Sequence, residues 1–317
     1  MARCLVLGAN GFIGSHLVDA LIQQNHFVRC FDRYTNPSVI WADQNNSHIE
    51  IFDGDFASPQ SIEAALDSID YVFHFISTTN PFSSEKNPKI DLTTNIPFSI
   101  ELFELCAKKN IKRIIFPSTS AIYGDHAGQE LFREDDCPLP VSPYAIGKLA
   151  IESYLRFYNK KIDLPYLVLR IANPFGPRQN PQSNQGVIAT FLHAAAQSEP
   201  ITIYGDGSMV RDYLYIEDLA EMIVGLFQKE TKYSVYNLGS GVGQSIQEIA
   251  ATVEKVTGHP LAKKFIEAPA SFVKKVVLDT SRLTSEFEVA PKTSLEDGIR
   301  KTWEYIQNVP GKQPQRT

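Results

Sequence analysis

The chain has 317 residues, of which 43% are hydrophobic and 21% charged, enough apolar material for one large domain or two modest ones. Its formal net charge is −6 and it has no basic stripe, so the charge pattern does not indicate binding to nucleic acid or to an anionic membrane. Its four scattered cysteines and the lack of any span of about 20 apolar residues indicate no disulfide framework, metal site, membrane segment or signal peptide, and we expect a cytoplasmic protein.

The first predicted elements are a strand, a glycine turn and a helix. An apolar run at residues 4–7 enters a Gly-x-x-Gly-x-x-Gly turn at 8–14, and helical periodicity follows through residue 22. Such a turn lets the backbone approach a pyrophosphate closely, although by itself it could equally join two packed elements. The positions that it would contribute to a dinucleotide site are Gly8, Gly11, Phe12, Ile13 and Gly14.

An acidic residue ends the second predicted strand. The apolar run at 27–31 leads to Asp32, about 20 residues beyond the glycine turn, where a carboxylate can bind both hydroxyl groups of a ribose. The same charge would repel the 2′-phosphate of NADP, so the sequence favours NAD. The neighbouring Arg33 leaves NADP as the alternative, because an arginine there can accommodate that phosphate.

Further short apolar runs at 49–52, 71–75, 114–116 and 166–171 alternate with helical stretches. This alternation predicts a Rossmann-type, doubly wound parallel sheet, accompanied by a smaller α/β substrate-binding domain. Within the helical stretch at 89–109, Pro97 should produce a kink or a break. The apolar side chains of that stretch are expected to face the sheet or a neighbouring helix; they are Leu92, Ile96, Ile100, Phe103 and Leu105.

Two fragments near the middle of the chain together indicate a hydride-transfer site. Ser142 can cap a helix whose first residue is a proline, which places Tyr144 in the first turn and Lys148 on the same face. A phenol becomes a base near neutral pH only if its pKa falls by roughly 3 units, or about 4 kcal/mol, through nearby positive charge. Lys148 and an oxidised nicotinamide would supply that charge, and Thr119 would offer a hydroxyl to the reacting oxygen. Considered without the other motifs, Tyr144 and Lys148 could instead be an ordinary pair of side chains on the surface of a helix.

The character of the chain changes after residue 172. Residues 173–186 contain three prolines and several amides, which suggests a substrate-side loop at a domain boundary. Strands at 201–204 and 210–215 and helices near 217–228, 245–257 and 295–306 are expected beyond it. We therefore predict a NAD-binding domain (1–172, with 210–240 packing back onto it), a substrate-binding domain (173–209 and 241–308) and a flexible tail (309–317).

Taken together, these features resemble the extended short-chain dehydrogenase/reductases, specifically nucleotide-sugar epimerases of the UDP-glucose 4-epimerase type. The resemblance covers almost the whole chain and rests on the glycine turn, Asp32, the segments 53–56 and 74–75, Asn95, Thr119, Tyr144, Lys148 and the segments 173–178 and 211–213. It implies NAD as the cofactor and a nucleotide-diphosphate sugar as the substrate. It also implies a homodimer in which the 89–109 stretch pairs with the Tyr144 helix of a second subunit, with burial inside one subunit as the alternative.

The resemblance implies roles for individual cofactor-binding residues. Asp55 and Phe56 would flank the adenine, and Asn95 would line the cofactor. The remaining positions assigned to the cofactor are Phe75, Ile76, Ser77, Thr78, Ser118 and Ile171, together with Tyr144 and Lys148.

On the substrate side, the resemblance implies that Arg211 clamps the diphosphate, a task suited to the planar fork of a guanidinium. A solvated surface arginine is the alternative. Asn173 would contact the diphosphate and sugar, Thr202 and Tyr204 would line the uridine, and Val187 would complete the site.

Two positions in the C-terminal part depart from the family's pattern. Reading back without gaps from Asp279, the place of a second phosphate-binding arginine is Pro269, for which Lys274 or Lys275 would have to substitute. On the same reading, Val276 occupies the position that limits bulk at C2 of the sugar, where a small residue would admit a 2-acetamido group.

A third departure concerns the residues after Thr119. The related 4,6-dehydratases and uronate decarboxylases have an acidic side chain there, whereas this chain has Ser120 and Ala121. Because elimination needs a second positioned proton-transfer group, this difference confines the expected chemistry to redox at C4.

The sequence therefore predicts an NAD-dependent isomerase that inverts C4 of UDP-glucose and UDP-galactose, or of their 2-acetamido forms, through a transient 4-keto sugar. A nucleotide-sugar 4-keto reductase or a dehydratase is the alternative enzyme. The alternative that is not an enzyme is a dinucleotide sensor without catalytic activity. The presence of all three residues Thr119, Tyr144 and Lys148 argues against it.

Overall fold

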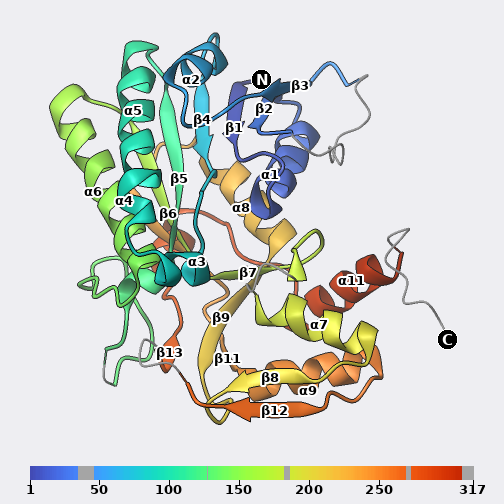
Figure 1. The fold of residues 1–317 in the computed structure, drawn as a ribbon. Helices are drawn as coiled ribbons and strands as arrows, with labels where there is room; N and C mark the ends of the chain where they lie inside the picture. Colours follow the sequence, from blue (N-terminus) through green and yellow to red (C-terminus); the bar gives the residue numbers. More distant parts are fainter. Residues whose placement is uncertain (35–45, 127, 182–185, 269–272, 309–317) are drawn as a thin grey trace. The chain divides into compact units, whose positions relative to one another are not determined.

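A computed structural model describes residues 1–34, 46–126, 128–181, 186–268 and 273–308 (Figure 1). The chain forms two compact units. The first comprises Met1–Ile122, Ser142–Arg170 and Ala220–Tyr236, and the second comprises Tyr123–Val141, Ile171–Leu219 and Asn237–Thr317. The predicted tail at 309–317 lies outside the described residues.

A seven-stranded sheet, most of whose residues belong to the first unit, has the spatial order β10-β6-β5-β4-β1-β2-β3. Its strands are β1 (Arg3–Leu7), β2 (Phe27–Asp32), β3 (Ile49–Asp53), β4 (Tyr71–His74), β5 (Arg113–Thr119), β6 (Tyr166–Ile171) and β10 (Val235–Leu238). The neighbours from β5 through β4, β1 and β2 to β3 all pair in parallel. The predicted doubly wound α/β fold is confirmed.

The helices of the first unit lie between and beside these strands. They are α1 (Phe12–Gln23), α2 (Pro59–Ala65), α3 (Pro81–Lys86), α4 (Ile90–Thr93), α5 (Asn95–Lys108) and α6 (Pro143–Ile162), with a short 3₁₀ turn at Ser120–Tyr123. None of the helices in the described part of the chain is long and apolar enough to cross a membrane.

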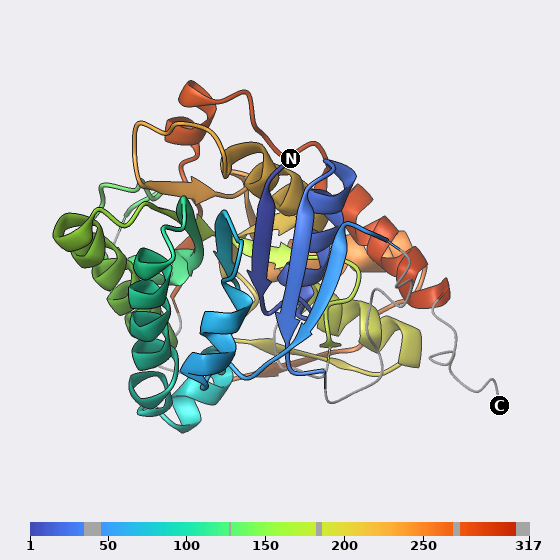
Figure 2. The ribbon, with the colours of Figure 1, turned by 90° about the horizontal axis from the view of Figure 1, so that it is seen from above.

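Helices cover both faces of this sheet because its strands are apolar on both sides. On one face, Phe116 and Val168 belong to a single apolar cluster with residues of α2, α5 and α6. On the other face, the ring of Phe227 lies 4.9 Å from that of Tyr71 and 5.3 Å from that of Phe73. Figures 1 and 2 show α5 and α6 side by side on one face and α1 on the other. Each such buried side chain contributes about 1.5–3 kcal/mol.

The order of the strands changes direction at β1. β2 and β3 lie on one side of β1, whereas β4 and β5 lie on the other. Ligands of open α/β sheets bind beyond the carboxyl ends of the strands at such a switch point. Here Leu7 pairs with His74, so the glycine turn after β1 and the segment after β4 begin next to each other.

The predicted interruption of the 89–109 stretch lies at Thr94, between α4 and α5. Pro97 has no N–H and its ring would collide with the carbonyl of Thr93, so Thr94 takes a non-helical conformation (φ −128°, ψ −80°). The expected inward orientation is wrong for Leu92, which is 63% exposed because α4 has only 4 residues and buries Asp91 instead. The other apolar side chains of the stretch are buried or partly buried; they are Ile96, Ile100, Phe103 and Leu105.

The second unit is built around β9 (Val210–Tyr215). Its other strands are β7 (Asn173–Phe175), β8 (Ile201–Tyr204), β11 (Gly243–Ser245), β12 (Lys263–Ile266) and β13 (Lys275–Val276). Its helices are α7 (Val187–Gln197), α9 (Ile246–Thr257), α10 (Ser281–Glu286) and α11 (Leu295–Asn308), and α8 (Ile216–Leu226) belongs to both units. β9 pairs with β7, β11 and β13, whereas β8 pairs with β12 in a separate two-stranded sheet.

A buried carboxylate ties the strands of the second unit together. Asp212, on β9, is 1% exposed. Its Oδ1 accepts hydrogen bonds from N and Oγ of Ser240 at 2.8 and 2.6 Å. Its Oδ2 accepts from N of Gly241 at 3.1 Å and from N of Leu278 at 3.4 Å. These donors replace the water that the carboxylate loses on burial.

Asp212→Asn is expected to lower the free energy of unfolding by about 2–4 kcal/mol, because an amide NH₂ would face donors that need an acceptor. Urea unfolding measures the loss. Asp206→Asn is the matched control, since Asp206 accepts from N of Ser208 in an exposed turn that asparagine also forms. Asp212→Asn with wild-type stability would contradict this role.

Candidate active site

The glycine turn after β1 has no room for side chains. A Cβ at Gly8 would lie 2.8 Å from N of Ile76, and a Cβ at Gly14 would collide with the carbonyl oxygen of Gly8. Gly11 is the N-cap of α1, and the first turn of that helix contains no acidic residue. The positive end of α1 is therefore open to an anion, an arrangement that fits the pyrophosphate of a dinucleotide.

Asp32 lies at the end of β2 and contacts Asn10. Asn10 precedes the first turn of α1, which includes Phe12 and Ile13. Oδ2 of Asp32 accepts a hydrogen bond from N of Asn10 at 2.9 Å, and Oδ1 accepts one from N of Arg33 at 2.8 Å. Burial raises the pKa of Asp32, and these hydrogen bonds oppose the shift. Each oxygen keeps a lone pair for a ribose hydroxyl, and the Arg33 side chain is exposed.

The segment after β4 lies beside the glycine turn. N of Phe75 donates to the carbonyl oxygen of Leu7 at 3.0 Å. Phe75 and Ile76 are partly buried, whereas Ser77 and Thr78 are exposed. Oδ1 of Asn95 accepts from N of Thr78 at 2.9 Å, which ties this segment to α5.

The two residues predicted to flank the adenine differ in exposure. Asp55 is exposed, and its Oδ1 accepts from N of Ala57 at 3.0 Å. Phe56 is 5% exposed and its ring lies 5.2 Å from that of His74, so its side chain belongs to the core.

Helix α6 carries Tyr144 and Lys148, and it begins as the sequence predicts. Oγ of Ser142 accepts from N of Ala145 at 3.3 Å, and a proline occupies the first helical position. Nζ of Lys148 donates to the carbonyl oxygen of Pro117 at 3.0 Å. It also lies 5.8 Å from the centre of the Tyr144 ring. The helix start and the strand β5 therefore fix the phenol and the ammonium near each other.

Burial shifts the pKa values of these two groups in opposite directions. Burial, with the charge of Asp91 adding to it, raises the pKa of Tyr144 to about 12. Burial lowers the pKa of Lys148 to about 8, and the charges of Asp91 and Glu152 oppose that shift. Both shifts have the same physical cause, because leaving water disfavours whichever form is charged.

Thr119 ends β5, two residues after the carbonyl group that Lys148 binds. Its Oγ1 accepts from N of Ala121 at 3.2 Å, and its side chain is partly exposed. Oγ of Ser118 is buried and has no hydrogen-bond partner among the described residues. A buried hydroxyl without a protein partner is costly in free energy unless water or a ligand group satisfies it.

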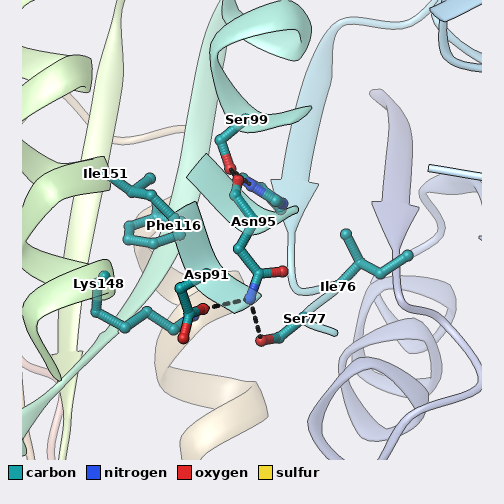
Figure 3. A pocket seen from close by; sticks show the side chains of 10 residues that line it. Ile76, Ser77, Asp91, Asn95, Ser99, Phe116, Lys148 and Ile151 are labelled. Atoms are coloured by element: carbon teal, nitrogen blue, oxygen red, sulfur yellow. Dashed lines mark hydrogen bonds between the residues drawn. The ribbon is translucent and has the colours of Figure 1, made fainter. Parts of the chain in front are cut away.

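A small cavity gathers residues from five helices and strands of the first unit and from the segment after β4 (Figure 3). The predicted residues in its lining are Ile76, Ser77, Asn95 and Lys148; His74, Asp91, Ser99, Phe116, Gly147 and Ile151 complete it. Among these, Asp91 and Ser99 carry polar groups that the sequence analysis did not select. Asp91 lies on α4 and Asn95 begins α5, so the break at Thr94 separates them and no helical periodicity in the sequence pairs their side chains.

Apart from Thr119, the predicted substrate residues lie in the second unit. Nδ2 of Asn173, on β7, donates to the carbonyl oxygen of Asp212 at 2.9 Å. Nη1 of Arg211 donates to the carbonyl oxygen of Val210, and Nη2 donates to that of Val273, both at 2.8 Å. Burial lowers the pKa of Arg211. Asn173 and Arg211 thus lie on paired strands, β7 and β9.

The other predicted residues of this unit are more scattered. Thr202 and Tyr204 are exposed on one face of β8, Val187 begins α7, and Ile171 is buried at the end of β6. Val276 is 4% exposed. Lys275 forms an ion pair with Glu130, Lys274 is exposed, and Pro269 lies outside the described residues.

Comparison of this chain with known proteins shows to which protein family it belongs. The chain belongs to the NAD dependent epimerase/dehydratase family, which its residues 4–239 match. The protein is therefore an enzyme of this family, and the predicted family and cofactor are confirmed.

Two solved structures and one further relative show the range of this likeness. A UDP-glucose 4-epimerase of Thermotoga maritima, solved with UDP-glucose, is 33% identical with a TM-score of 0.89, covering 96% of this chain and 98% of that one. A Thermus thermophilus UDP-glucose 4-epimerase in complex with NAD is 29% identical, also with a TM-score of 0.89, covering 96% and 99%. A UDP-N-acetyl-alpha-D-glucosaminuronate decarboxylase of Bacillus cytotoxicus is 27% identical, covering 97% and 98%.

His74, at the end of β4, is a buried histidine that the structure keeps neutral. It is 2% exposed, and its Nε2 lies 2.8 Å from Oγ of Ser99, which itself donates to the carbonyl oxygen of Asn95 at 2.5 Å. Nε2 is therefore the protonated nitrogen. Burial lowers the pKa of His74 from 6.5 to about 3, and the charge of Lys148 adds to the shift.

This histidine should contribute to acid destabilisation. The unfolded chain protonates it near pH 6.5 and the folded chain only near pH 3, so stability is complete above pH 6.5 and falls below it. Between pH 7.5 and pH 5 the loss from this group is about 2 kcal/mol. His74→Gln keeps a donor for Ser99 but does not titrate, so urea unfolding of the variant should lose about 2 kcal/mol less than wild type over this range.

The exposed His259, changed to glutamine, serves as the control for replacing a histidine at the surface. An identical pH dependence in His74→Gln and wild type would contradict the neutral, buried state of His74.

Proposed function

We propose that the protein inverts C4 of a UDP-activated sugar, UDP-glucose and UDP-galactose or their 2-acetamido forms, through a transient 4-keto sugar. The observation that supports this most is the arrangement of Thr119, Tyr144 and Lys148 at the end of β5 and the start of α6, in the same unit as the glycine turn. The likeness to an epimerase solved with UDP-glucose favours a UDP sugar.

Each residue of this set has a proposed role. Tyr144 removes the proton of the 4-hydroxyl group, and Thr119 hydrogen-bonds the same oxygen. Lys148 binds the nicotinamide ribose and stabilises the phenolate. NAD, when bound, would supply the hydride acceptor and donor and the positive charge of the oxidised ring. That charge is needed because burial and Asp91 raise the pKa of Tyr144 in the protein alone.

The residues after Thr119 support epimerisation over elimination or decarboxylation. Ser120 and Ala121 begin a 3₁₀ turn, and neither offers a carboxylate. A reaction that goes beyond the 4-keto sugar needs a further proton-transfer group near this position. A 4-keto reductase would use the same three residues, and net consumption of reduced cofactor distinguishes it.

We further propose that residues 1–172 and 210–240 form the NAD-binding domain and that 173–209 and 241–308 bind the sugar nucleotide. The cofactor would contact the positions assigned to it from the sequence. For the substrate, Arg211 and Asn173 would bind the diphosphate, Thr202 and Tyr204 the uridine, and Val187 would lie nearby.

A homodimer is also proposed, through the outer face of α6. This face exposes apolar side chains at Ile146 (52%), Tyr154 (38%) and Phe157 (49%), which a second subunit would cover.

Tyr144→Phe tests the proposal, because it removes the proposed base and keeps the ring. We expect kcat for interconversion of the UDP sugars to fall by at least about 100-fold. Chromatography of the products from UDP-glucose, UDP-N-acetylglucosamine and their galacto epimers measures this, with absorbance of reduced nicotinamide followed in parallel. Tyr154→Phe, on the exposed face of the same helix, is the control and should retain full activity. A Tyr144→Phe variant that keeps more than a few per cent of the rate would exclude Tyr144 as the base.

A further inference from the structure

Asp91 is a buried acidic residue that no assigned role explains. It lies on α4, is 5% exposed, and contributes to the cavity into which Lys148 extends from α6 (Figure 3). A four-residue helix at the surface more often carries acidic side chains toward water, and carboxylates are rarely buried unless they are paired. The position of Asp91 therefore requires a partner that compensates its charge.

The hydrogen bonds of Asp91 engage only one side of its carboxylate. Oδ1 accepts from Oγ1 of Thr79 at 2.8 Å and from Nδ2 of Asn95 at 2.6 Å. Oδ2 is buried and has no hydrogen-bond partner among the described residues. Two neutral donors thus fix the orientation of the group, and they leave its negative charge uncompensated.

Helix α6 passes close to this carboxylate because it has a glycine there. A Cβ on Gly147 would lie 3.2 Å from both Cβ and Cγ of Asp91 and 3.4 Å from its Oδ1. The next residue is Lys148, whose ammonium lies 4.7 Å from the centre of the Phe116 ring and donates to the carbonyl oxygen of Pro117. The buried carboxylate and the buried ammonium therefore line one cavity, and the backbone of Gly147 closely approaches the Asp91 side chain.

The other charged and titratable groups around Lys148 either have an ion-pair partner or are neutral. On α6, Glu152 binds Arg170 of β6, with Oε2 2.9 Å from Nη2 and Oε1 3.4 Å from Nε. From β4, His74 is neutral, and on α6 itself Tyr144 is a phenol. Of the carboxylates that act on Lys148 among the described residues, Asp91 is the one without a cation of its own.

We propose that Asp91 is a positioning residue that acts through Lys148: its charge keeps the Lys148 ammonium protonated inside the cavity, while Thr79 and Asn95 hold the carboxylate in place. The inference rests on the proposed function, in which a charged Lys148 is needed beside Tyr144. Burial lowers the pKa of Lys148 to about 8, and the Asp91 charge is the largest influence that raises it. Without Asp91 the pKa of Lys148 would therefore be lower still.

Asp91→Asn removes the charge and keeps an Oδ1 acceptor for Thr79 and Asn95. Carbon NMR of protein labelled at Cε of lysine follows the titration of Lys148 directly, and the signal missing from Lys148→Arg assigns it. We expect the Lys148 midpoint to fall by roughly one pH unit or more in Asp91→Asn. Thr79→Val is the matched control, because it removes one hydrogen bond to the same carboxylate and leaves the charge. An unchanged midpoint in Asp91→Asn would overturn the proposal.

The free energy of unfolding gives a second test that does not depend on assigning a resonance. Lys148→Met leaves Asp91 as a buried carboxylate without its cation, so it should be strongly destabilising. Adding Asp91→Asn to Lys148→Met should restore part of the stability, because the two charges disappear together. Additive losses in the double variant would show that the two groups do not interact and would overturn the proposal.

Enzyme kinetics then connects the charge to the reaction. The alkaline limb of the kcat profile should move to lower pH in Asp91→Asn and stay in place in Thr79→Val, with KM for the sugar nucleotide little changed in both. If wild type epimerises none of the UDP sugars, the proposed function fails, whereas the NMR titration and the double variant still decide the role of Asp91.

Discussion

The candidate site depends on keeping one ammonium group charged where little water reaches it. Lys148 is 9% exposed, and removing an ammonium from water costs several kcal/mol even after the protein relaxes. The carbonyl oxygen of Pro117, the face of the Phe116 ring and the charge of Asp91 offset that cost. The phenol of Tyr144 shares this desolvated environment, which disfavours its phenolate, so the charge of Lys148 matters for both groups.

Several features of the first unit follow from this constraint. Pro97 ends α4 early, and the short helix turns Asp91 inward while Leu92 faces solvent. The amide of Asn95, the first residue after the break at Thr94, joins Asp91 to the segment that follows β4. That segment abuts the glycine turn at Gly8, so hydrogen bonds through Asn95 connect Asp91 with the segment beside the proposed cofactor crevice. A substitution in α4 should therefore affect chemistry without touching a substrate.

Much of this could be predicted from the sequence, because the signals are local and periodic. The β1 strand, the glycine turn and the capped start of α6 at Ser142 all follow from short patterns with a physical cause. Asp91 could not be found in this way, since an acidic residue in a short polar stretch normally faces water, and its burial results from the break that Pro97 imposes. The short strands β7, β11 and β13 also escaped prediction, because they form by pairing with β9 and have no alternation of their own.

The most direct test of the account follows the hydrogen at C4. A UDP sugar carrying deuterium at C4 is incubated with the protein, and both the epimer formed and the position of the label are read by NMR and mass spectrometry. The account predicts that the epimer retains deuterium at C4 with no net change in reduced nicotinamide, since the hydride leaves and returns within one site. Loss of the label to water, or accumulation of reduced cofactor in step with product, would contradict it.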